Sequence, residues 1–206
     1  MLKINIMTRT LLIIIFFQSL WINANAFNVN DHRIAVLVND QLITSYDVVQ
    51  RMKLSVILSG IEITAENKNQ LINSVVDELV KENLKNQKMN EYDISVSEEE
   101  YLKQELRFYQ NSQINKEDLI KIFELNNIKY SEFKKYLIND ISWQKLVSGM
   151  YYRLTSTSEI EIEEIIMNNP NMSKETARDL IVQKQLDIKS NKMIRDLLNE
   201  ATIEYK

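Results

Sequence analysis

The sequence contains no cysteine, and this absence removes several kinds of chemistry at once. Thiol nucleophiles, disulfide bridges and the usual structural zinc sites all depend on that side chain. Histidine is almost absent as well, because His32 is the only one in 206 residues. One histidine without cysteine makes a poor set of metal ligands, so we expect no metal site and place His32 at the surface before the first strand.

Glycine and proline are also scarce, with two and one residues respectively. Enzymes of the α/β class need glycine in phosphate-binding loops and in the turns between strands and helices. This chain cannot supply those turns, and its composition instead indicates a mainly α-helical protein. The formal net charge of −4 disfavours binding to nucleic acid and to anionic membrane surfaces.

The first 26 residues have the layout of a secretory signal peptide. Lys3 and Arg9 flank the start, a short apolar run covers residues 11–17, and residues 23–26 read Asn-Ala-Asn-Ala. The apolar stretch is shorter than the roughly 20 residues that a membrane-spanning helix needs. We therefore expect cleavage after Ala26, export to the periplasm and no stable membrane insertion, with an uncleaved anchor as the alternative.

Two strand-like segments lie near opposite ends of the remaining chain, at residues 33–39 and 201–205. A lone strand leaves its backbone groups without partners, so we expect these two to pair in a small antiparallel β element. Asn39 and Asp40 tolerate left-handed backbone and predict a turn, after which Leu42 and Ile43 form a brief return strand.

The rest of the chain is expected to be helical, because apolar residues recur at intervals of three and four. Caps mark the helix starts: Thr44 with Asp47, and Ser97 with Glu100, have the spacing of capping boxes. Gly60 is expected to close the first helix with a positive φ. The first expected helix runs from Ser45 to about Leu58, and the second from about Thr64 to about Met89. Three further helices are expected to follow the caps Ser97, Asn115 and Ser131. The last two are expected over residues 158–168 and 174–199.

The segment from Arg33 to Val48 resembles the opening of SurA-type periplasmic chaperones. The matching residues are Val36, Val38, Asn39, Ile43, Thr44 and Asp47. The later elements follow in the same order, and residues 194–205 resemble the closing helix and strand of that family. The resemblance implies one chaperone core over residues 27–206, in which helix 174–199 and strand 201–205 fold back on the N-terminal part.

The chain departs from the SurA pattern where parvulin-type prolyl isomerase domains usually stand, because residues 169–173 alone occupy that place. A parvulin domain is rich in glycine and builds its site around paired histidines with cysteine or aspartate. We therefore expect no isomerase activity, no catalytic residues and no cofactor. The glutamates at helix starts, such as Glu98 and Glu159, are interpreted as complements of helix dipoles.

Two runs of aromatic and methionine side chains are the candidates for substrate binding: Phe108-Tyr109 and Met150-Tyr151-Tyr152. Neighbours on a helix point about 100° apart, so one narrow face cannot bury them all. Exposed members would bind extended, aromatic-rich polypeptides, and methionine suits promiscuous contacts. The alternative is that these side chains pack in the core.

These observations favour an ATP-independent periplasmic holdase that binds unfolded outer-membrane or envelope proteins. The alternative is a structural or adaptor subunit of a cell-envelope complex that binds one folded partner.

Overall fold

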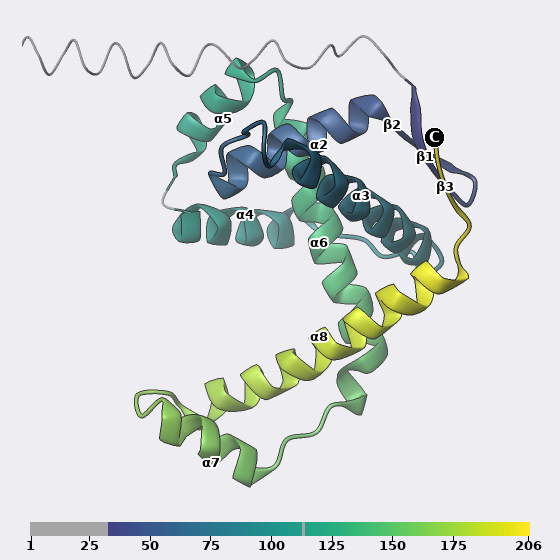
Figure 1. Cartoon of the computed structure of the whole chain (residues 1–206). Helices are drawn as coiled ribbons and strands as arrows, with labels where there is room; N and C mark the ends of the chain where they lie inside the picture. Colours follow the sequence, from purple (N-terminus) through teal and green to yellow (C-terminus); the bar gives the residue numbers. More distant parts are fainter. Residues whose placement is uncertain (1–32, 113) are drawn as a thin grey trace, which may run out of the picture.

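The computed structural model describes residues 33–112 and 114–206, in which seven α-helices accompany a small antiparallel sheet (Figure 1). The predicted signal peptide, its cleavage after Ala26 and the predicted surface position of His32 lie outside these residues. The elements are β1 (Ile34–Val38), β2 (Gln41–Thr44), α2 (Ser45–Ser59), α3 (Lys68–Asn90), α4 (Glu98–Ser112), α5 (Lys116–Leu125), α6 (Tyr130–Tyr151), the 3-10 helix η1 (Tyr152–Leu154), α7 (Glu159–Asn168), α8 (Lys174–Glu200) and β3 (Ile203–Tyr205).

The sheet joins segments from opposite ends of the described chain, as predicted. β1 is the middle strand and pairs antiparallel with both β2 and β3. Val36 lies opposite Tyr205 and Val38 lies opposite Ile203. The last strand begins two residues later than expected, because Ala201 still closes α8 through a 3.1 Å hydrogen bond from its backbone N–H to the Leu197 carbonyl.

The predicted turn and caps at the start of the fold are confirmed. Asn39 adopts the left-handed conformation with a φ of 53° between β1 and β2. Thr44 and Asp47 form the capping box that begins α2, and Gly60 ends that helix with a φ of 67°. Ser97 and Glu100 exchange the equivalent pair of hydrogen bonds at the start of α4.

Two predicted helix starts were wrong. Ser131 lies inside α6, which begins at Tyr130 because the Tyr130 ring packs beside Phe133 and its hydroxyl donates to Glu105. Thr64 does not open α3 directly. Its backbone N–H donates to Asn67 Oδ1 at 2.8 Å in a separate turn, so α3 begins at Lys68.

The buried side chains form four clusters along the fold. The first packs the sheet on α2 and α3, with Val36, Val38, Ile43, Met52 and Val80 at its centre. The second joins α4, α5 and the first half of α6 to the end of α2, and its largest buried side chains are Tyr101, Leu119, Phe123, Phe133 and Leu137.

The last two clusters attach α8 to the rest. The third joins α3, α6 and α8 through Met89, Trp143, Leu146, Leu186 and Met193. The fourth joins α7 to the start of α8 through Ile162, Ala177 and Ile181. We call residues 159–188, which comprise α7 and the first half of α8, the arm.

Figure 1 shows the arm projecting from the helical body, while the far end of α8 reaches the sheet. Among the described residues, no helix combines the length and apolar character needed to cross a membrane.

Candidate functional site

The arm forms by local signals that start and stop its helices. Ser158 and Glu161 make a capping box that begins α7. The Met172 backbone N–H donates to the Asn169 carbonyl at 2.9 Å in the turn around Pro170, and the Ser173 side chain caps α8. The small Ala177 side chain, which is fully buried, lets α7 approach α8 closely.

A groove of about 690 Å³ runs between α7 and α8. Its apolar lining consists of Ile165, Leu180, Ile181 and Ile188. Ile181 is buried, whereas Leu180 and Ile188 are 47% and 59% exposed. Leu180, Lys184 and Ile188 are four positions apart in turn, so they follow one face of α8. The groove therefore presents aliphatic surface that the chain itself leaves open.

Further apolar side chains of α7, and of the segment that precedes it, are exposed without lining the groove. Ile160 and Met167 lie seven positions apart on α7 and are 79% and 81% exposed. Tyr152 and Leu154 precede the arm and are 61% and 67% exposed. Single exposed apolar residues are ordinary on protein surfaces, but their concentration on one projecting element is typical of an interaction surface.

Acidic side chains dominate the rim of the groove. Glu161, Glu164 and Asp187 line it with Lys184 as the single cation among the lining residues. Asp187 accepts a hydrogen bond from Gln183 Nε2 at 2.9 Å, and Glu161 is held by its capping box. Within residues 114–206, no hydrogen bond or ion pair engages the Glu164 carboxylate. The groove is thus apolar in its lining and negative at its edge.

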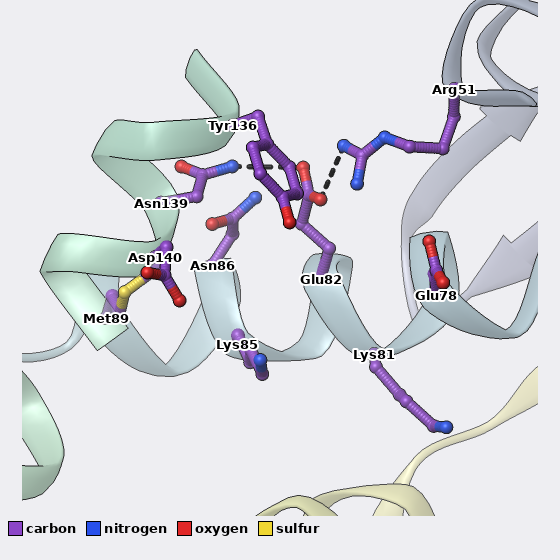
Figure 2. A pocket seen from close by; sticks show the side chains of 10 residues that line it. All are labelled: Arg51, Glu78, Lys81, Glu82, Lys85, Asn86, Met89, Tyr136, Asn139 and Asp140. Atoms are coloured by element: carbon purple, nitrogen blue, oxygen red, sulfur yellow. Dashed lines mark hydrogen bonds and ion pairs between the residues drawn. The ribbon is translucent and has the colours of Figure 1, made fainter. Parts of the chain in front are cut away.

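A second, polar pocket lies between α2, α3 and α6 (Figure 2). Its volume is about 220 Å³. Arg51 Nη2 pairs with Glu82 Oε2 at 2.5 Å, and Asn139 Nδ2 donates to Glu82 Oε1 at 3.0 Å. The Arg51 guanidinium also lies 5.5 Å from the centre of the Tyr136 ring. These contacts bind three helices to one another.

Lys85 and Asp140 form a second pair of opposite charges in this polar pocket. Burial lowers the pKa of Lys85, and the nearby Asp140 carboxylate opposes that shift. Burial likewise raises the pKa of Asp140, with Lys85 opposing. Since Arg51 faces Glu82 and Lys85 faces Asp140, we interpret the polar pocket as a structural junction.

A buried glutamate organises the second cluster. Glu105 is 5% exposed and accepts hydrogen bonds from the Tyr101 and Tyr130 hydroxyls. Lys116 Nζ lies 3.1 Å from Glu105 Oε2. Burial alone would raise the pKa of Glu105, but the two hydroxyls and Lys116 outweigh it and lower the pKa. The network holds α4, α5 and α6 together with its carboxylate ionised.

The two predicted binding runs occupy different environments. Phe108 and Tyr109 are half-buried in the second cluster: the Phe108 and Phe133 ring centres are 4.8 Å apart, and the Tyr109 and Tyr130 hydroxyls are 2.6 Å apart. These contacts are the core packing that the sequence left as an alternative, and a binding role for both residues stays a prediction.

The second run spans the end of α6 and the first residue of η1. Met150 is 36% exposed and Tyr152 is 61% exposed, while Tyr151 packs against the third cluster. Its binding role also stays a prediction. Sequence reasoning did not select the exposed apolar residues of the arm. The available signal was the apolar sequence of α7, in which Ile160, Ile162, Ile165, Ile166 and Met167 surround more of the helix than one partner covers.

Comparisons with known proteins give a family and a distant structural likeness. A family model described as the SurA-like N-terminal domain matches residues 2–147. A search of curated proteins finds no match. Among solved structures, the chain is similar to one from a study of PEB4 and Cj1289, described as structurally related SurA-like chaperones of Campylobacter jejuni. That match has 13% identity and a TM-score of 0.48, and it covers 84% of this chain and 98% of the other.

Proposed function

The chain belongs to the family of SurA-like N-terminal domains, and on this premise we propose that it is a periplasmic holdase chaperone. Family membership supports the chaperone role in the periplasm. The proposal adds that the clients are unfolded outer-membrane or envelope polypeptides, and that binding needs no ATP. It also treats residues 27–206 as one unit after removal of residues 1–26.

The observation that carries the proposal is the open apolar surface of the arm. A groove lined by aliphatic side chains, together with the exposed Ile160 and Met167 on α7, suits brief contacts with many apolar segments. Several weak contacts along one client add up through effective concentration, so no single deep pocket is required. Tyr152 and Leu154, which precede the arm in the sequence, are exposed as well.

The proposal excludes prolyl isomerase activity. The family's isomerase domains would stand between α7 and α8, where the sequence offers residues 169–173 and a turn around Pro170. Measured with a proline-containing test peptide, the rate of cis-to-trans exchange is expected to equal the uncatalysed rate.

The experiment for the chaperone role is light scattering from an aggregating, unfolded outer-membrane protein. Stoichiometric wild-type protein is expected to suppress aggregation. The double variant Ile160→Asp with Met167→Asp is expected to lose most of that effect while keeping its stability, because both side chains are largely exposed.

The control is Leu125→Asp, which places one such charge on a 79% exposed apolar residue of α5 outside the arm. It is expected to behave like the wild type. Unchanged aggregation with wild-type protein contradicts the chaperone proposal, and stable co-purification with one folded protein supports the adaptor role in its place.

A further inference from the structure

We infer that the groove of the arm selects apolar client segments that are flanked by lysine or arginine. This inference rests on the proposed function and names the class of segment that the site prefers. It follows from the charge of the groove rim, considered together with the apolar lining.

The lining sets the apolar part of the ligand. At about 690 Å³, the groove falls within the range of roughly 300 to 1,000 Å³ that is usual for ligand sites. Leu180 and Ile188 present their exposed surfaces along one face of α8, and Ile165 contributes from α7. An apolar segment seated there removes these side chains from water, which supplies the driving force.

The rim sets the charge of the flanks. The lining residues include three carboxylates, at Glu161, Glu164 and Asp187, against one ammonium group at Lys184. All four charged residues of α7 are glutamates. Among these, Glu159 is compensated by Lys174 and Arg178, with the nearest atoms 3.3 Å and 3.6 Å apart, and these two cations lie outside the groove lining.

Lys184 does not neutralise the negative charge of the rim. It is an exposed residue between Leu180 and Ile188 on α8, and its single ammonium group stands against three carboxylates among the lining residues. The net charge of the lining residues therefore stays negative. A basic flank gains attraction at this rim, whereas an acidic flank meets repulsion.

The same charge argues against a lipid surface as the occupant. Anionic membranes attract basic helices and repel acidic ones, and α7 carries only negative charge. We therefore assign the groove to polypeptide.

The test compares two labelled peptides with one identical apolar core, flanked on both sides by two lysines or by two glutamates. Fluorescence anisotropy with the full chain is expected to show tighter binding of the lysine-flanked peptide by about tenfold at low salt, the scale of two or three exposed ion pairs. The ratio of the two dissociation constants is expected to shrink as salt rises, since salt screens exposed charges.

A matched pair of charge reversals locates the effect. Glu164→Lys is expected to reduce the preference for the lysine-flanked peptide several-fold, because Glu164 lines the groove. Glu163→Lys changes the net charge of α7 equally at an exposed residue outside the lining, and is expected to change the ratio much less.

The outcomes separate the two proposals. If both peptides bind equally, and Leu180→Asp weakens both, the chaperone proposal stands and the charge selection is wrong. If neither peptide binds, both proposals are wrong. Stronger binding to anionic phosphatidylglycerol vesicles than to the lysine-flanked peptide also overturns the inference.

Discussion

Asn39 and Thr202 hold each other through two hydrogen bonds, although 163 positions separate them in the sequence. The Asn39 backbone N–H donates to the Thr202 carbonyl at 2.8 Å, and the Thr202 N–H donates to Asn39 Oδ1 at 3.0 Å. Asn39 Nδ2 also donates to Gln87 Oε1 at 2.8 Å. One side chain therefore ties the β1–β2 turn both to the start of β3 and to α3.

Replacing Asn39 is expected to destabilise the fold in two separable steps. Asn39→Gly keeps easy access to the φ of 53° but loses the side-chain hydrogen bonds, whereas Asn39→Ala also strains the backbone. We expect the glycine variant to lose about 1 kcal/mol of unfolding free energy and the alanine variant about 2 to 3 kcal/mol. Urea unfolding measures both, and two variants as stable as the wild type would contradict this role.

Ile162→Ala is expected to loosen the arm and leave the body folded. Ile162 is fully buried in the fourth cluster, which has only two other buried residues, Ala177 and Ile181. Truncating a buried isoleucine costs about 2 to 5 kcal/mol, more than so small a cluster is expected to absorb. Hydrogen exchange should quicken in α7 and stay unchanged in α3. Ile160→Ala, on the same helix but 79% exposed, is the control and should change neither.

The ionised Glu105 is expected to make the fold sensitive to acid. Its pKa is lower in the folded protein than the ordinary value of 4.5, because the hydrogen bonds from Tyr101, Tyr130 and Lys116 outweigh burial. Such a group stabilises the fold above its unfolded pKa, and that contribution is lost as pH falls through the lowered folded pKa. We expect the unfolding free energy to decline below about pH 4.5, the ordinary pKa of the carboxyl.

Glu105→Gln tests this source of acid sensitivity. The variant is expected to be less stable at pH 7 by about 1 to 3 kcal/mol, because it loses charged hydrogen bonds in a buried site. Its stability should also fall less steeply in acid. A residual slope is expected from Glu100, since the hydrogen bond from Lys145 lowers the pKa of Glu100 to about 2. A slope equal to that of the wild type would show that Glu105 is not the source.

The two predicted binding runs are expected to respond differently to substitution. Phe108→Ala removes a half-buried ring that packs on Phe133, and should cost up to about 3 kcal/mol of stability. Tyr152→Ser changes a side chain that is 61% exposed, so stability should stay within about 0.5 kcal/mol while suppression of client aggregation weakens. Chemical unfolding and light scattering measure the two effects, and normal suppression by Tyr152→Ser would exclude Tyr152 from the binding surface.

The features that the sequence predicted correctly depend on local signals. The capping residues Thr44 and Ser97 have their hydrogen-bond partners three positions later, so these helix starts follow from the local sequence. The pairing of β1 with β3 follows from a general need, because a strand must satisfy its backbone groups.

The features that the sequence missed depend on contacts between distant elements. Tyr130 joins α6 because its ring and hydroxyl meet Phe133 and Glu105, and no local pattern shows the contact with Glu105, which lies on another helix. The exposure of Ile160 and the burial of Ile162 depend equally on where α8 lies against α7. Two isoleucines of the same helix, two positions apart, therefore differ in solvent exposure, although the residue type is the same.

The central place of β1 also has a consequence for biosynthesis. A ribosome makes β1 long before β3, and until β3 follows, one edge of β1 offers bare N–H and C=O groups to any extended chain nearby. During that interval the nascent protein resembles the polypeptides that it is proposed to protect.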